Sequence, residues 1–255
     1  MINLATFVRA WGKAEIYKTP PVRGFWWEAT GIREGPTVNL NELIKSGHFP
    51  KIYDPSRRIP DDIFDKLVEF IYSIPTSVNA QSTHYFVAST PEARSRIADH
   101  MGEGFEFNVP KVRNASHVIV LATRETLSNE YLDELHTKEI ADGKFPNQAL
   151  ADQWKATVRM WIDLHRYDVK DLQHWMEKQT YLALGMSLMA AEELGISASP
   201  LEGFNSRILD AELGLREKGF TVTVLLALGY RDESDVYAKT PKSRLPIDRH
   251  FTFLK

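Results

Sequence analysis

One segment of this chain, residues 171–194, is apolar on nearly every side of a helix. Large hydrophobic residues recur through it without leaving a polar stripe: Trp175, Met176, Tyr181, Leu182, Leu184, Met186, Leu188 and Met189. A helix with this pattern is buried on most of its faces. In a chain of 255 residues it is either a central core helix or part of a subunit interface. Gly195 follows it, where a glycine commonly ends a helix.

The remaining pattern predicts a mixture of helices and strands. The continuous apolar run TVTVLLAL at residues 221–228 indicates a strand covered on both faces. Further strands are expected at 84–89 and 117–122. Helices are expected from Pro60 until Pro75, from the Thr90 cap to about Met101, over 149–168, and from the Asn205 cap to about Leu213. Because these elements do not alternate as βαβ units, the sequence predicts an α+β fold.

The two ends of the chain differ from its middle. Residues 1–38 carry half of the six tryptophans, and their hydrophobic residues do not recur with the period of a strand or a helix. We therefore interpret them as an N-terminal arm, which is either appended or docked over apolar surface. The main domain is expected to span 39–255 and to begin with a short helix at 39–46 that ends at Gly47. Residues 232–255 have few hydrophobic anchors and are expected to cross a surface of this chain or of a partner.

Composition excludes several classes of protein. The net charge of -3 provides no electrostatic footprint for nucleic acid or an anionic membrane. The chain has no cysteine, which excludes disulfides, thiolate metal sites and cysteine nucleophiles. No stretch approaches the roughly 20 apolar residues of a membrane span, and no signal peptide is expected. These features are compatible with a cytoplasmic protein.

The sequence lacks self-sufficient catalytic machinery. It contains no G-x-G-x-x-G after a strand, no phosphate-binding P-loop and no G-x-S-x-G elbow. The pairs His136/Glu139, His165/Asp168 and His174/Glu177 each offer only two of the ligands that a zinc site needs, so no metal is expected. If the protein is an enzyme, a bound cofactor supplies its reactivity.

Four segments together resemble one family. They are PTSVNAQ at 75–81, Phe107-Asn108 with Lys111 and the following ASH, PLEGF at 200–204, and PKSRLP at 241–246. Their order and spacing are similar to those of the oxygen-insensitive NAD(P)H nitroreductases and related dihydropteridine reductases. The resemblance implies an intertwined homodimer with an antiparallel core sheet flanked by helices, and FMN bound at the dimer interface.

The resemblance also implies residues that hold the cofactor. Lys242 and Arg244 match the family's phosphate-binding pair, and Lys51 matches a lysine that contacts the flavin ring or its ribityl chain. Thr76, Ser77 and Asn79 match the loop around the ribityl chain and the ring edge. Groups at the flavin ring are matched by Asn108, Lys111, Gln179, Pro200, Glu202 and Gly203.

The segment at Gly203 would approach the reactive flavin nitrogen, where a side chain would block access. Trp161, Phe105 and Phe107 match aromatic walls of the substrate pocket, which suit a planar ligand. Each residue also has a plainer interpretation: Lys242 and Arg244 as surface charge, Trp161 as core, Thr76 and Asn79 as a turn.

The chain departs from the family pattern at three places. Gly47 and Phe49 replace an arginine and a serine, which removes a phosphate fork and a hydroxyl donor. Because charged hydrogen bonds contribute roughly 1.5–3 kcal/mol each, FMN is expected to bind about one or two orders of magnitude more weakly. Ser82-Thr83 replaces a Pro-Trp pair, and the arm has no counterpart.

The resulting prediction is a ping-pong oxidoreductase. NAD(P)H and then a nitroaromatic, quinone or related acceptor would use one pocket in turn. The first alternative is a dihydropteridine or enone reductase on the same fold. The second is a degenerate binding protein that no longer holds FMN firmly, an alternative motivated by Gly47 and Phe49.

Overall fold

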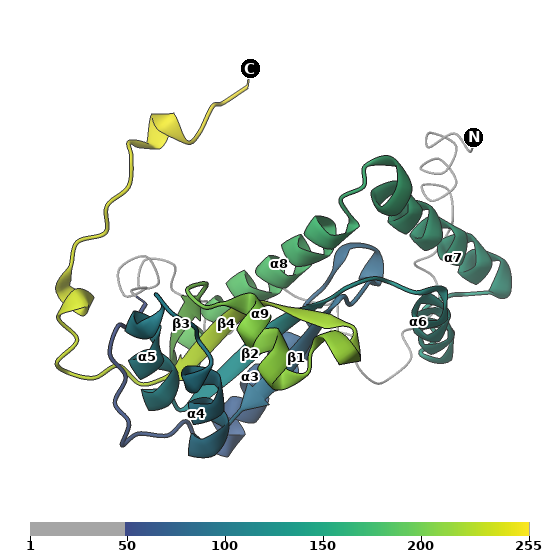
Figure 1. Ribbon diagram of the computed structural model, residues 1–255. Helices are drawn as coiled ribbons and strands as arrows, with labels where there is room; N and C mark the ends of the chain where they lie inside the picture. The colour runs from purple at the N-terminus through teal and green to yellow at the C-terminus, as the bar shows by residue number, and fades with distance from the viewer. Residues whose placement is uncertain (1–48, 255) are drawn as a thin grey trace. The chain divides into compact units, whose positions relative to one another are not determined.

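The computed structural model describes residues 49–254. Its centre is a four-stranded, wholly antiparallel sheet in the order β1-β2-β4-β3 (Figure 1). The strands are β1(Thr83–Ala88), β2(His117–Arg124), β3(Ser197–Leu201) and β4(Phe220–Gly229). The antiparallel α+β prediction is therefore confirmed. The two central strands, β2 and β4, are buried along almost their whole length, as the continuous apolar run in β4 predicts.

Helices cover both faces of the sheet. On one face lie α4(Pro91–Asp99), α5(Val109–Asn114) and α9(Ser206–Leu213), whose apolar residues form a core with Val118, Val120 and Leu225. On the other face α3(Asp61–Tyr72) and α8(Leu172–Glu193) pack against Ile119 and Leu121. The core thus lies in two layers separated by the sheet.

A bulge in β4 changes which side chains face each layer. The pairing with β2 shifts between Leu121, opposite Val224, and Ala122, opposite Val222, so that Thr223 is the extra residue. Val222 consequently faces the same layer as Leu225, whereas Val224 faces the opposite one. A single extra residue reverses the alternation of a strand, and here it keeps apolar side chains in both layers.

A third cluster lies beneath an excursion between β2 and α8. The excursion contains α6(Asn129–Ala141) and α7(Gln148–Asp163), followed by a π-helical turn at Leu164–Asp168. Its core residues are Ala80, Leu127, Leu132, Ile162, Trp175 and Met176. The predicted helix over 149–168 is thus interrupted at its end. Helices α5 and α6 and strand β3 were not predicted from the sequence.

Capping residues predicted from the sequence lie at the ends of several helices. Thr90 Oγ1 accepts from the amide of Ala93 at 3.2 Å, and Asn205 Oδ1 accepts from the amides of Arg207 and Ile208. These are the expected N-terminal caps of α4 and α9. After α8, Gly195 adopts a left-handed φ of 69°, which ends the helix as predicted.

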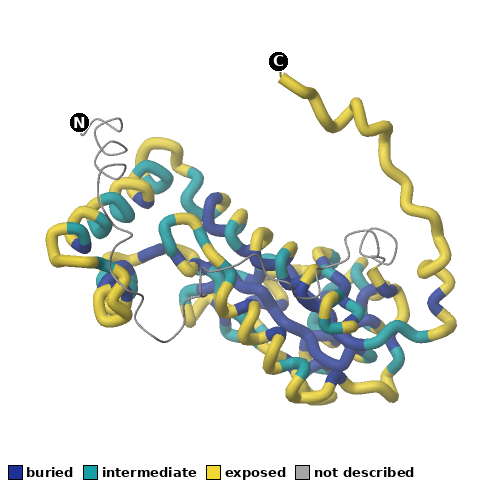
Figure 2. Tube along the Cα trace, turned by 180° about the vertical axis from the view of Figure 1, so that it is seen from behind, coloured by how far each residue is buried: buried dark blue, intermediate teal, exposed yellow. Residues whose placement is uncertain are grey.

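The long helix α8 is buried on one side only. Trp175, Met176, Ala183 and Leu184 face the interior, whereas Tyr181, Leu182 and Met189 are between 41% and 53% exposed. Beyond residue 232 the chain is almost entirely exposed and includes the large apolar side chains of Leu245, Ile247, Phe251, Phe253 and Leu254 (Figure 2). The helix and the tail therefore both present apolar surface that is exposed in the described part of the chain.

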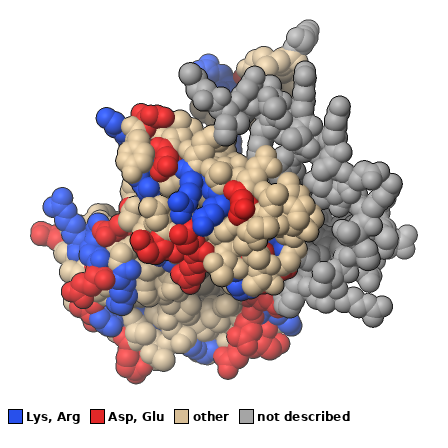
Figure 3. Space-filling view, turned by 90° about the vertical axis from the view of Figure 1, so that its right-hand side faces the viewer, with Lys and Arg blue, Asp and Glu red and all other residues tan. Residues whose placement is uncertain are grey.

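The N-terminal arm at 1–38, the helix expected at 39–46 and its cap Gly47 lie outside the described residues. Within residues 49–254, no helix is long and apolar enough to cross a membrane. On the face of the molecule in Figure 3, acidic and basic side chains are interspersed, in keeping with the net charge of -3.

Candidate functional site

A buried polar cluster joins α5 to the segment after β3. The amide nitrogen of Asn108 donates to the carbonyl of Gly203 at 3.0 Å, and Lys111 Nζ donates to Asn108 Oδ1 at 2.6 Å. Asn108 and Lys111 are both buried. Asn108 precedes α5 and Lys111 lies in its first turn, so that the two side chains occupy the same side of the helix.

A side chain at Gly203 would displace neighbouring side chains. A Cβ atom built there would lie 2.6 Å from Asn108 Nδ2 and 2.9 Å from Phe107 Cζ. Such distances force a neighbour to move. The glycine therefore allows the backbone of the 200–203 segment to pack directly against Asn108. The approach of this backbone to a flavin stays a prediction.

Two lysines converge at this cluster. Burial lowers the pKa of Lys111, and the neighbouring positive charge of Lys51 lowers it further. The Lys51 segment is fixed by the amide of Lys51, which donates to Asp235 Oδ2 at 2.9 Å, and by the Tyr53 hydroxyl, which donates to the Ala227 carbonyl at 2.8 Å. Positive charge concentrated in this way favours an anionic ligand.

A second group of residues meets at the loop before β1. The amide of Ser77 donates to Gln179 Oε1 on α8 at 2.9 Å, and the amide of Gln81 donates to Thr76 Oγ1 at 3.0 Å. Asn79 lies in the same loop with a φ of 55°. The structure thus brings together Thr76, Ser77, Asn79 and Gln179, four of the residues predicted to contact the cofactor.

Helix α8 connects the two groups. Two residues after Gln179, the hydroxyl of Tyr181 donates to Glu202 Oε1 at 2.7 Å. Burial and the adjacent Glu202 carboxylate raise the pKa of Tyr181 to about 12. Two residues before Glu202, Pro200 lies in edge strand β3 opposite Leu226, where its missing N–H is tolerated. Gln179 and Tyr181 therefore hold the two loops from one helix.

The predicted aromatic walls lie in two places. The rings of Phe105 and Phe107 are 6.5 Å apart, and Phe107 is 64% exposed beside the polar cluster. Trp161 lies on α7, 38% exposed, and α7 and α5 stand at opposite ends of the described structure (Figure 1). Within one chain, Trp161 and the phenylalanine pair do not share a pocket.

The remaining predicted residues are on the exposed tail. Lys242 and Arg244 are both exposed, and Arg244 donates to the carbonyl of Ser243 at 2.7 Å. Phe49, at the position of the missing serine, is 48% exposed. Among the described residues no group of three metal-binding side chains occurs. His165 forms a hydrogen bond with Asp171 at 2.5 Å.

Three residues that hold these loops were not predicted as site residues: Tyr181, Asp235 and Glu139. Asp235 accepts from Lys51 and Arg231, and Glu139 accepts from Asn79. A buried carboxylate is unusual unless it is paired, but neither residue carries a sequence signal of burial.

An antiparallel core sheet flanked by helices is the class of structure that the resemblance implies, and the structure has it. A model of the nitroreductase family matches residues 50–230. The oxygen-insensitive NAD(P)H nitroreductase of Salmonella typhimurium is 37% identical over 202 residues, covering 79% of this chain and 93% of that protein. The same-named protein of Enterobacter cloacae is 37% identical over 212 residues, 82% and 97% of the two chains. The chain belongs to the nitroreductase family.

Solved structures support the fold. An enone reductase of gut-bacterial fatty acid saturation superposes with a TM-score of 0.70 at 23% identity, covering 86% of this chain and 99% of that chain. A protein of Exiguobacterium sibiricum, solved in complex with FMN, superposes with a TM-score of 0.70 at 20% identity, covering 86% and 98%.

Proposed function

We propose that this protein is an FMN-dependent oxidoreductase that transfers two electrons from NAD(P)H to nitroaromatics, quinones or related small acceptors. The observation that carries the proposal is the cluster of Asn108, Lys111 and Gly203 with Lys51 beside it. The family relatives with the highest identity reported above are named NAD(P)H nitroreductases. The enone reductase alternative rests on a likeness of fold at 23% identity and is not favoured.

The residues of this cluster fit a flavin. The pyrimidine end of the ring offers carbonyl and N–H groups that match an asparagine amide and a lysine ammonium. When bound, FMN supplies reversible two-electron chemistry. Lys111 and Lys51 would place positive charge where negative charge develops, which is electrostatic preorganisation. Gly203 would present its backbone, rather than a side chain, to the ring.

The loop and α8 would complete the cofactor site. Thr76, Ser77 and Asn79 would line the ribityl chain, with Gln179 fixing the loop from α8. Pro200 and Glu202 would set the distance of the opposite segment from the ring. Phe105 and Phe107 would form an apolar wall against which a planar nicotinamide or acceptor stacks. No side chain need act as a general acid in this proposal, since water can supply the protons.

We further propose that the working unit is a homodimer. Within residues 49–254, Tyr181, Leu182 and Met189 form an exposed apolar strip on α8, and the tail beyond residue 232 carries exposed apolar side chains. A groove of about 950 Å³ runs along β1 between α3 and α6. A tail of a second copy lying in this groove would be buried there, and packing of the two copies along α8 would bury the exposed strip. Apolar burial of this kind drives association.

Dimerisation would also complete the site. Trp161 lies on α7, at the other end of the described structure from α5 (Figure 1), and Lys242 and Arg244 lie on the exposed tail. We propose that all three serve the partner's site. Lys242 and Arg244 would bind the FMN phosphate, for which cations and bidentate arginine are suited. A cytoplasmic location, with no nucleic acid or membrane partner, is part of the proposal. The role of residues 1–38 stays a prediction.

The test is the visible absorption spectrum of the purified protein with added FMN, together with light scattering. A yellow dimer that bleaches with NADH or NADPH and regains its colour with menadione or a nitroaromatic supports the proposal. A colourless protein that takes up no FMN at high concentration overturns it and favours the non-enzymatic alternative. A yellow monomer would retain the cofactor and refute the shared site.

A further inference from the structure

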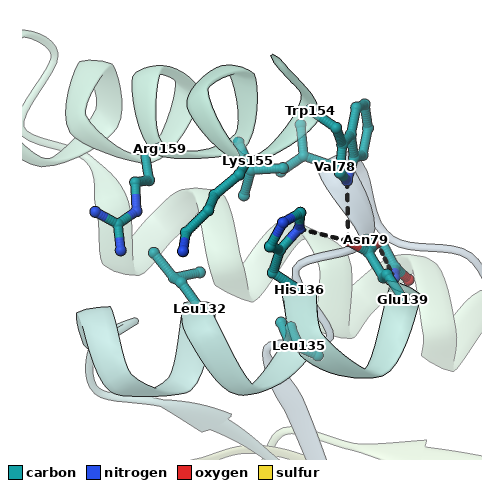
Figure 4. Close-up of a pocket in the computed structure, with 10 residues that line it drawn as sticks. Val78, Asn79, Leu132, Leu135, His136, Glu139, Trp154, Lys155 and Arg159 are labelled. Carbon is teal, nitrogen blue, oxygen red and sulfur yellow. Dashed lines mark hydrogen bonds and ion pairs between the residues drawn. The ribbon is translucent and has the colours of Figure 1, made fainter. Parts of the chain in front are cut away.

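Glu139, on α6, is a buried carboxylate with an unusual set of partners. It accepts from Asn79 Nδ2 at 2.8 Å, from Trp154 Nε1 at 3.1 Å and from Lys144 Nζ. Its side chain is only 10% exposed. Figure 4 shows Asn79, Trp154 and Glu139 converging from three different elements. An ionised carboxylate has only acceptor sites, and three donors offset the cost of removing it from water.

The first of these donors belongs to the loop of the proposed cofactor site. Val78, Asn79 and Gln81 all have positive φ angles, of 46°, 55° and 44°. A left-handed conformation is uncommon for such residues, above all for the β-branched Val78, and persists only where the surroundings impose it. The loop therefore needs external contacts to keep its shape.

Helix α6 supplies those contacts at both of its ends. Near its start, the hydroxyl of Tyr131 donates to the carbonyls of Ala80 and Gln81, at 3.2 and 2.8 Å. Near its end, Glu139 holds the side chain of Asn79. Between them, Val78 and Ala80 pack into the third core cluster. The loop is thus held by α6 in addition to its contact with Gln179 of α8.

The second donor extends the connection to the substrate side. Trp154 lies on α7, the helix that carries Trp161. A single carboxylate therefore joins the cofactor loop to the helix of the proposed substrate wall. The cavity beside this cluster measures about 10 Å³, room for about one water molecule. The cluster therefore links the loop to α7 and is too small to bind a ligand.

We propose that Glu139 is a positioning residue that holds the 76–81 loop in its cofactor-binding shape through Asn79. Glu139 itself would touch neither cofactor nor substrate. The inference rests on the proposed function, because it assumes that this loop contacts FMN. Helix α6 would then contribute to FMN affinity although none of the residues predicted to contact FMN lies on it.

The test compares Glu139→Ala and Glu139→Gln with Glu130→Gln, an exposed residue in the first turn of the same helix. Two quantities are measured on purified full-length protein: amide hydrogen exchange of residues 76–81 without FMN, and the FMN dissociation constant by fluorescence titration. Glu139→Ala is expected to speed exchange in the loop and to weaken FMN binding about ten-fold. Glu139→Gln, which keeps one acceptor, should fall between it and wild type, and Glu130→Gln should match wild type.

A double variant separates positioning from general destabilisation. If Glu139 acts through Asn79, then adding Glu139→Ala to Asn79→Ala should weaken FMN binding by less than about two-fold more, because interacting residues are not additive. If the two substitutions instead weaken FMN binding independently, so that their fold-changes multiply in the double variant, the proposal is overturned. So would a Glu139→Ala protein that melts earlier while its loop exchange and FMN affinity equal those of wild type.

Failure of the wider function is distinguishable. If wild type takes up no FMN, the flavin proposal fails, whereas loop exchange in the FMN-free protein still tests whether Glu139 fixes the loop. Should Glu139→Ala not fold, Glu139→Gln must still show faster loop exchange than Glu130→Gln, and equal exchange in these two variants refutes the inference.

Discussion

The hydroxyl of Tyr181 donates a 2.7 Å hydrogen bond to Oε1 of Glu202, and this bond ties α8 to the segment that carries Gly203. Gln179, half a turn earlier, ties the same helix to the amide of Ser77. The helix therefore sets the spacing between two loops that are more than a hundred residues apart in sequence. Because a helix is rigid over half a turn, a change at either contact should move one loop relative to the other.

Tyr181→Phe is expected to lower kcat/KM about ten-fold or more, since a hydrogen bond to a charged group contributes about 1.5 kcal/mol or more. FMN content should stay close to wild type because Tyr181 is not among the predicted cofactor ligands. With its pKa raised to about 12, Tyr181 stays protonated between pH 6 and 10, so the fall should be the same across that range. Steady-state kinetics at three pH values measure this, and an unchanged kcat/KM contradicts the positioning role.

Gly203→Ala is expected to weaken FMN binding about ten-fold or more. The new Cβ would lie 2.6 Å from Asn108 Nδ2, and relief of such overlap costs about 1–3 kcal/mol and displaces the amide. Fluorescence titration of FMN into the variant measures the affinity. The prediction is wrong if affinity is retained while the protein remains folded by circular dichroism.

Leu182→Asp is expected to dissociate the proposed dimer. Leu182 is 46% exposed on the outer face of α8, and a carboxylate buried there without a partner would cost several kcal/mol. Light scattering measures the mass, and FMN content should fall with it. Ile208→Asp on α9, where Ile208 is 40% exposed, is the matched control and should leave the mass unchanged. A dimeric Leu182→Asp protein would place the interface elsewhere.

His117 is expected to make stability depend on pH. Burial, together with Arg58 and Arg94, lowers its pKa from the usual 6.5 to about 4. Since the unfolded chain then binds the proton first, this contribution is complete above pH 6.5 and is lost as the pH falls toward 4.

The expected loss on this account is about 2 kcal/mol of unfolding free energy between pH 7 and pH 5. Urea unfolding at the two pH values measures it. His117→Asn should show a correspondingly smaller difference between them, whereas His174→Asn, whose side chain is 78% exposed in wild type, should behave as wild type. Equal pH dependence in all three proteins would refute the assignment.

Much of the fold was predictable because its signals are local. Thr90 and Asn205 cap the helices that follow them, and Gly195 ends α8, since each signal acts within a few residues of its own position. The apolar run in β4 predicted burial on both faces. Helix α6 was not predicted because its apolar residues make no strong stripe, so its helical state depends on packing against α7 and the loop at 76–81.

The candidate site likewise has features that the sequence predicted and others that depend on tertiary structure. The sequence determined the residue types through their resemblance to a family: an asparagine and a lysine one turn apart, a glycine within PLEGF, a loop of small polar residues. Tertiary structure alone decided that Asn108 meets Gly203 from 95 residues away, that Glu139 holds Asn79, and that Trp161 lies far from Phe107 within one chain. Such contacts depend on how layers pack and which loops close, and a pattern of hydrophobicity along the chain specifies which faces are buried without specifying which polar atoms meet there.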